Sequence, residues 1–140
     1  MEFNTITESL EKINSNKISI VELNDIFINR VKKNKDLNAF IYFDEENISQ
    51  QIKNIQISKN KFKLKGIPLA IKDLFCTKNM PTTAGSKILQ DFQPTYESHV
   101  SQKLLDQGSI FLGKANCDEF AMGSSTNTSY YGNTINPISP

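Results

Sequence analysis

Two stretches near the N-terminus repeat apolar residues at the spacing of an amphipathic helix. Each begins with a capping-box sequence, Thr-Ile-Thr-Glu at residues 5–8 and Ser-Ile-Val-Glu at residues 19–22, in which a hydroxyl and a glutamate can satisfy free amides. The pattern predicts two helices joined by a polar link at residues 14–17. The apolar positions are Ile6, Leu10 and Ile13 in the first helix and Val21, Leu23, Ile26, Phe27 and Val31 in the second.

The apolar pattern then changes to that of a strand between Leu37 and Phe43, where β-prone residues follow one another. Asp44 can cap a third helix, because its carboxylate can accept hydrogen bonds from free amides at a helix start. A lysine-rich stretch at residues 59–65 is expected to be a solvated link. The apolar side of the third helix is expected to carry Ile48, Ile52 and Ile55.

A fourth helix is predicted at about residues 97–107, with Gly108 as its C-terminal stop. A short strand at residues 109–113 follows directly. Helix, glycine and strand form an αβ unit, and together with the earlier elements they predict an α/β layered fold. The residues expected to face inward from this helix are Val100, Leu104 and Leu105.

The stretch from Gly66 to Asp73 combines turn signals, a short apolar run and two charged residues at its end. Pro68 belongs near the start of a strand because it cannot donate a ladder hydrogen bond. Lys72 then emerges where the apolar strand ends, which is a usual place for site residues in α/β folds. An ammonium group held partly out of water is easier to deprotonate and can act as a base. The alternative is a lysine that reaches solvent or pairs with Asp73.

A second candidate site follows Asp118, which can cap a short helical turn at residues 119–121. The chain then enters a hydroxyl-rich loop at residues 123–129. Small side chains suit a loop that lines a pocket and orients an amide, although such a loop can also be a solvent-exposed connector. The candidate substrate-binding residues are Met122, Gly123, Ser124 and Ser125.

Composition limits the classes of protein to which the chain can belong. With 38% hydrophobic and 22% charged residues among 140, one domain with a real core is expected. A formal net charge of +1 gives no electrostatic case for direct binding of nucleic acid. No secretory signal and no membrane-spanning run are visible.

The few cysteines and histidines also restrict the chemistry. Cys76 and Cys117 lie far apart in the sequence, which excludes a local zinc cluster and indicates free thiols in a reducing compartment. We therefore expect a cytoplasmic protein, or one from an organelle of bacterial descent. His99 is the only histidine and is expected on a helix surface.

Two of these segments resemble one known family. The sequence Gly-Ile-Pro-Leu-Ala-Ile-Lys-Asp at residues 66–73 resembles the strand that carries the catalytic lysine in the amidase signature family. The sequence Gly-Lys-Ala-Asn-Cys-Asp-Glu-Phe-Ala-Met-Gly-Ser-Ser-Thr at residues 113–126 is similar to the A subunits of aspartyl/glutamyl-tRNA amidotransferases within that family. Many other members carry a shorter Thr-Pro-Glu-Phe-Gly sequence there. The likeness covers the whole chain but only the N-terminal part of a family member.

The resemblance implies an α/β/α fold with a mixed sheet covered by helices. Residues 1–35 would form a helical N-terminal segment and residues 36–140 the first part of the α/β core of a single amidase domain. It also implies a catalytic triad of Lys72, a bridging serine in a cis peptide and a nucleophilic serine. The nucleophile would attack the side-chain amide of glutamine, ammonia would leave, and water would release glutamate.

The resemblance further implies a ligase complex of protein biosynthesis, with B and C subunits as partners. Ammonia would pass to a partner subunit that uses ATP and Mg to activate misacylated glutamyl-tRNA, so this chain itself would hold no cofactor. Both catalytic serines belong to glycine-serine motifs that find no match in the 140 residues. Ser124 and Ser125 form a pair whose flanks differ from those motifs.

Losing one member of a triad costs nearly as much as losing all of them, so we expect a truncated A subunit that is inactive alone. Two alternatives stay open. One is another amidase of the same family that acts on a small amide. The other is a non-catalytic protein that binds a partner through its N-terminal helices, which in the family lie near the C subunit.

Overall fold

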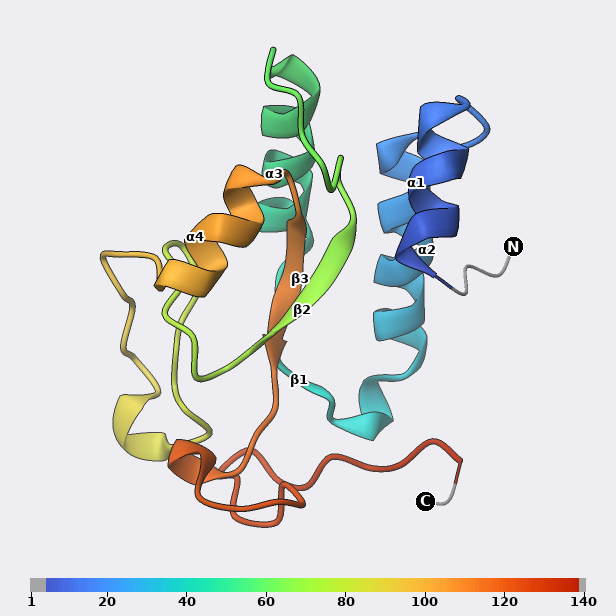
Figure 1. Cartoon of the computed structure of the whole chain (residues 1–140). Coiled ribbons are helices and arrows are strands. Elements are labelled where there is room, and N and C mark those ends of the chain that lie inside the picture. Colours follow the sequence, from blue (N-terminus) through green and yellow to red (C-terminus); the bar gives the residue numbers. More distant parts are fainter. Residues whose placement is uncertain (1–4, 139–140) are drawn as a thin grey trace.

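A computed structural model describes residues 5–138 and arranges them as a small sheet with helices on both faces (Figure 1). Three short 3-10 helices lie in the connections: η1 (Lys35–Leu37), η2 (Lys87–Leu89) and η3 (Glu119–Ala121). The other elements are α1 (Ile6–Asn14), α2 (Ile20–Lys33), β1 (Phe40–Phe43), α3 (Glu45–Ile57), β2 (Pro68–Lys72), α4 (His99–Asp106) and β3 (Ile110–Ala115).

The sheet is mixed, with the strand order β1-β3-β2. The central strand β3 runs parallel to β2, with Lys72 opposite Ala115, and antiparallel to β1. The parallel pair is connected through α4, as in a βαβ unit. Consequently β2 and β3 end at the same edge of the sheet, and the segments that follow them start close together. The predicted α/β class and mixed sheet are confirmed.

The core is divided by β3, whose side chains alternate between the two faces of the sheet. Ile110 and Leu112 pack in a cluster with residues of α2 and α3. Phe111 points to the opposite face and packs with Ile71, next to partly buried leucines of α4. At Gly113 an added Cβ would lie 2.1 Å from the carbonyl oxygen of Tyr42, so β1 can approach β3 only because this residue has no side chain.

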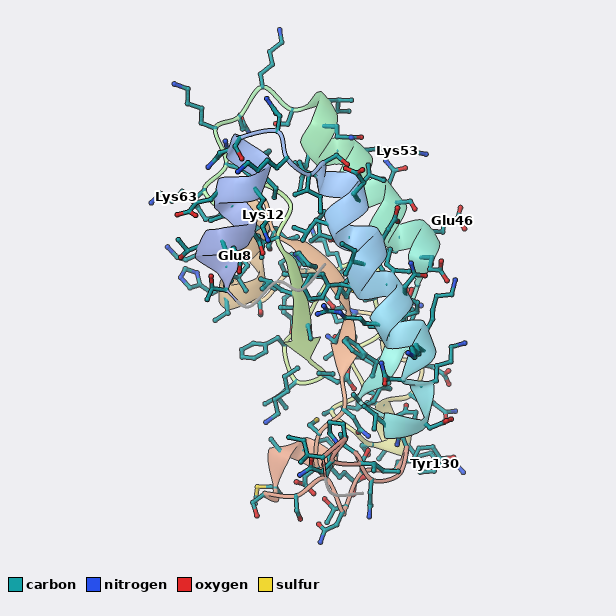
Figure 2. The ribbon with its side chains drawn as sticks, turned by 90° about the vertical axis from the view of Figure 1, so that its right-hand side faces the viewer. Glu8, Lys12, Glu46, Lys53, Lys63 and Tyr130 are labelled. Atoms are coloured by element: carbon teal, nitrogen blue, oxygen red, sulfur yellow. The ribbon has the colours of Figure 1, made fainter. Side chains whose placement is uncertain are left out.

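The predicted starts of the first three helices are confirmed, and they differ in how they are capped. Ser19 and Glu22 form a complete capping box at the start of α2. At α1, the hydroxyl of Thr5 accepts a hydrogen bond from the amide of Glu8. The carboxylate of Glu8 forms an ion pair at 2.6 Å with Lys12, one turn further along the helix (Figure 2). Asp44 caps α3 by accepting hydrogen bonds from two amides, as predicted.

Some positions differ from the predicted pattern. Val21 is 39% exposed. The buried face of α2 contains Leu23, Asn24 and Ile28, and Val21 lies at the edge of that face. Val100 is 48% exposed, since α4 begins only at His99 and packs through its later leucines. The strand predicted from Leu37 begins at Phe40, because the chain first forms η1 and then turns at Asn38, where φ is +50°.

Within residues 5–138, no helix combines the length and the apolar run that crossing a bilayer requires.

Candidate functional site

Lys72 is the last residue of β2, and its side chain is exposed at the sheet edge from which the segment after β3 also starts. The expected partial burial of its ammonium group is not found, and the lysine reaches solvent, as in the alternative. The segment after β3 forms the loops at the red end of the colour scale, at the lower end of the view in Figure 1. Lys72 and these loops line an open hollow of about 310 Å³. Its lining consists of Lys72, Asn116, Cys117, Asp118, Ala121, Gly123, Ser124 and Thr126.

The structure thus brings Lys72 together with two of the four candidate substrate-binding residues, Gly123 and Ser124. Met122 does not line the hollow and is 82% exposed. Ser125 does not line the hollow either, and its backbone amide donates to the carboxylate of Asp118, which does.

The side chain of Asp73, which follows Lys72, lies in the protein interior. Asp73 is fully buried, and its carboxylate lies 3.8 Å from the ammonium group of Lys114 on β3. It also accepts hydrogen bonds from the amide and hydroxyl of Thr83. The partners of the Asp73 carboxylate are therefore Lys114 and Thr83 in the interior, and not the adjacent Lys72.

Lys114 was not identified from the sequence, although a lysine inside the apolar run of a strand is an unusual signal. Its ammonium group donates to the carbonyl oxygen of Phe75 at 2.5 Å, to Thr82 at 2.8 Å and to Thr77 at 3.1 Å. Burial lowers the pKa of Lys114, while the nearby Asp73 carboxylate acts in the opposite direction. The three donors of the ammonium group are thus matched by three oxygens, all from the loop that follows Lys72.

Several residues around the hollow adopt left-handed backbone conformations that side chains other than glycine rarely take. Ala121 and Thr126, which line it, have φ of +58° and +59°. Phe120 and Ala84 both have φ of +51°, and the amide of Phe120 donates to the carbonyl oxygen of Ala84 at 2.8 Å. Strained backbone of this kind persists where surrounding contacts hold it and clusters at functional sites.

Asp118 was predicted to cap η3, but its side chain makes no capping hydrogen bond there. Its carboxylate instead faces the loop that follows and accepts from Ser125, Thr126 and Thr128. These contacts, the amide of Thr126 foremost, lower the pKa of Asp118. The backbone also leaves the helical path two residues after Asp118, because Phe120 has non-helical φ and ψ.

Within residues 5–138, other nucleophilic or metal-binding side chains do not assemble into a second centre. Ser86 is buried and donates to the carboxylate of Glu119 at 2.5 Å, so its hydroxyl serves a structural contact. Cys76 and Cys117 are free thiols, and burial raises the pKa of Cys117. Among the described residues, no three His, Cys, Asp or Glu side chains are placed to hold a metal ion.

Comparison with known proteins extends this picture. The model of the Amidase family matches residues 22–140. The A subunit of glutamyl-tRNA(Gln) amidotransferase from Pelagibacter ubique is 50% identical over 135 residues, which covers 96% of this chain and 28% of that protein. The protein of the same name from Legionella pneumophila is 41% identical and is covered over 29% of its length.

A solved structure gives the same result at the level of the fold. The A subunit of glutamyl-tRNA(Gln) amidotransferase from Thermotoga maritima superimposes with a TM-score of 0.75 at 35% identity, over 97% of this chain and 28% of that one. The chain thus spans less than a third of the length of these relatives. Because the family model matches most of the sequence and the fold recurs in a solved relative, the chain belongs to the amidase family.

Proposed function

We propose that this chain provides the lysine-bearing part of a glutamine-hydrolysing A subunit of glutamyl-tRNA(Gln) amidotransferase. The observation that carries the proposal is the position of Lys72, exposed at the end of β2 beside a polar hollow. The 50% identity to an A subunit of that name supports the choice of reaction.

In the proposed reaction, the side chain of Lys72 takes up a proton that a bridging serine relays from a second serine. The oxygen of that second serine attacks the side-chain carbonyl carbon of glutamine. The carbon–nitrogen bond then breaks, the nitrogen takes up a proton and ammonia leaves, so that a glutamyl ester remains on the serine. Water cleaves the ester and releases glutamate, and the proton returns to the starting arrangement.

Lys72 would supply the base, and the hollow beside it would hold the glutamine. The hollow has one wall that offers small and hydroxylated residues, Gly123, Ser124 and Thr126. Backbone and hydroxyl groups of this kind can orient an amide. Since neither serine of the triad has a match in the sequence, the 140-residue polypeptide is proposed to be inactive by itself.

The ammonia would be used by the partners of the protein. In this proposal the chain assembles with B and C subunits, and a partner uses ATP and Mg to activate glutamyl-tRNA for amidation. A non-catalytic partner-binding protein is the second candidate. It is favoured by α1, where Ile6 is 51% exposed next to a groove lined by Phe27 and Ile67.

The test is a two-part assay. This chain is co-expressed with the C-terminal part of the Pelagibacter ubique relative that lies beyond the matched region, together with B and C subunits, and ammonia release from glutamine is measured. Lys72→Ala should lower the rate by about two to four orders of magnitude, because a general base is lost. Lys53→Ala, which removes an exposed lysine on α3 (Figure 2), is the matched control and should not change it.

Near-normal ammonia release by Lys72→Ala would make Lys72 a structural residue and contradict the proposal. The proposal would also be contradicted if the wild-type chain and the C-terminal part co-purified with the B and C subunits but released no ammonia. If the chain alone captured the C subunit in that case, the partner-binding function would be favoured.

A further inference from the structure

The loop at residues 123–128 is largely exposed, yet it is tied to one buried carboxylate. Asp118 is only 5% exposed. Its Oδ2 accepts from the amides of Ser125 at 3.1 Å and Thr126 at 2.9 Å. Its Oδ1 accepts from the amide of Thr128 at 3.1 Å and from the Thr128 hydroxyl at 2.8 Å. The same hydroxyl accepts from the amide of Glu119, which joins the loop to the start of η3.

These contacts leave the carboxylate no room for another ligand. An ionised carboxylate offers about four acceptor positions on its two oxygens. Four donors of the loop already occupy Asp118, two on each oxygen. A substrate ammonium group that entered the hollow would therefore have to displace a loop contact to reach this residue.

Gly123 shows how closely the loop follows the carboxylate. A Cβ at this position would lie 2.4 to 2.7 Å from the carboxylate atoms of Asp118, so any side chain would push the two apart. Thr126, held in the left-handed conformation, donates the shortest of the backbone contacts to the same group. The carboxylate thus stabilises a loop conformation that the local sequence would not favour.

We propose that Asp118 is a positioning residue, which fixes residues 123–128 as a wall of the hollow that Lys72 also lines and does not itself bind substrate. The inference rests on the proposed function, because the hollow is taken to receive glutamine. The effect on the loop, however, is a property of this chain alone and can be measured without activity.

The first experiment compares amide hydrogen exchange in the wild-type chain and in Asp118→Asn, each co-expressed with the C-terminal part of the Pelagibacter ubique relative. An asparagine keeps the size but presents an NH₂ group, itself a donor, where two amides now donate. The amides of Ser125, Thr126 and Thr128 should exchange at least tenfold faster, while Leu112 in β3 is unchanged. Asp25→Asn, at an exposed position of α2, is the matched control and should leave all four unchanged. Unaltered exchange of the three loop amides in Asp118→Asn would overturn the proposal.

If Asp118→Asn also speeds amide exchange at Leu112, the substitution has disturbed the fold beyond the loop. The variant Thr128→Val is then used in its place. It keeps the β-branched shape and removes only the hydroxyl that contacts Asp118 and Glu119. Faster exchange confined to residues 119–128 then supports the positioning role, and exchange equal to wild type overturns it.

The second experiment uses the two-part assay. Asp118→Asn should raise KM for glutamine about tenfold with a smaller effect on kcat, since the wall of the hollow loosens while the base remains. A fall in kcat at unchanged KM would overturn the positioning role in favour of one in the chemical step. A silent wild-type assay combined with the expected exchange result would instead refute glutamine hydrolysis and leave the effect of Asp118 on the loop standing.

Discussion

Two lysines on neighbouring strands, Lys72 and Lys114, lie in opposite environments. Lys72 ends its strand exposed beside the hollow, whereas Lys114 is fully buried and donates to three loop oxygens. The buried lysine is held by its contacts and has no donor left for chemistry. Its function is to fix the loop that leaves Lys72, with Asp73 as the opposing charge.

Replacing Lys114 should therefore destabilise the fold. Lys114→Met keeps the length of the side chain but leaves Asp73 as a buried charge without its partner, a change that costs about 3–5 kcal/mol. Urea unfolding of the chain co-expressed with the C-terminal part of the Pelagibacter ubique relative, followed by circular dichroism, measures the effect. Lys53→Met on α3 is the exposed control and should stay within about 0.5 kcal/mol of wild type. A loss of the same small size in Lys114→Met would mean that the pair contributes little.

Gly123 offers a different prediction, because its surroundings leave no space for a side chain. In Gly123→Val the Cβ would clash with the Asp118 carboxylate and displace the loop wall of the hollow. In the two-part assay we expect a raised KM for glutamine. Asn127→Ala, at an exposed loop position that does not line the hollow, serves as the comparison and should leave KM unchanged. Unchanged KM and kcat in Gly123→Val would identify the loop as a connector.

The contacts of Asp118 also predict a pH dependence. Its pKa is lowered, because the amide of Thr126 and the other donors favour the ionised form. A depressed pKa means that this stabilisation is present above the usual aspartate value and is lost as the pH falls through the lower folded value. The amide proton shifts of Ser125, Thr126 and Thr128 should therefore titrate together below the usual aspartate range. Independent titrations of the three amides would argue against a shared carboxylate.

Local sequence patterns predicted a helix or strand correctly where the residues that determine it are neighbours in the sequence. Ser19 and Glu22 indicated the start of α2, and the apolar run after Pro68 indicated the strand that ends at Lys72. The errors arose where contacts are distant. No local signal reveals that β3 lies between β1 and β2. The donors that draw the Asp118 side chain away from η3 lie seven to ten residues further on.

The start of α3 carries a prediction of this local kind. Asp44 accepts from the amides of Glu46 and Asn47 and also from the hydroxyl of Tyr42, where burial and this contact raise the pKa of Tyr42 to about 12. Asp44→Ala should destabilise the chain by about 1 kcal/mol, the usual cost of losing an N-cap. Denaturant unfolding measures this cost, with Asp36→Ala at an exposed position of η1 as the control. Equal stability of the two variants would show that the cap is dispensable.

The candidate site illustrates the same limit for the molecule as a whole. Lys72 and the hydroxyl-rich loop were both recognisable as segments, yet their common hollow depends on the parallel pairing of β2 with β3. The buried pair of Lys114 and Asp73 depends on that pairing as well. Sequence reasoning therefore identified two segments of the candidate site but not the contacts that hold them together.

The last prediction concerns the stability of the 140-residue polypeptide. Within residues 5–138 the sheet has three strands, and a groove of about 570 Å³ lies along β1. Its lining is mostly apolar and also includes Arg30, Asn34 and Lys35. Tyr96, Val100 and Ile88 are exposed elsewhere on the surface. Open strand edges and uncovered apolar faces promote aggregation. We expect poor solubility and a broad thermal transition at low temperature when the chain is alone.

Co-expression with the C-terminal part of the Pelagibacter ubique relative should sharpen that transition, because this part would cover the groove. Differential scanning calorimetry of the chain alone and of the co-expressed pair measures the difference, and agreement of the calorimetric and van't Hoff enthalpies tests cooperativity. The ammonia assay on the chain alone should give no signal above buffer. A sharp, reversible melt together with measurable ammonia release would contradict both expectations, and would require a nucleophile among these residues other than the two serines of the triad.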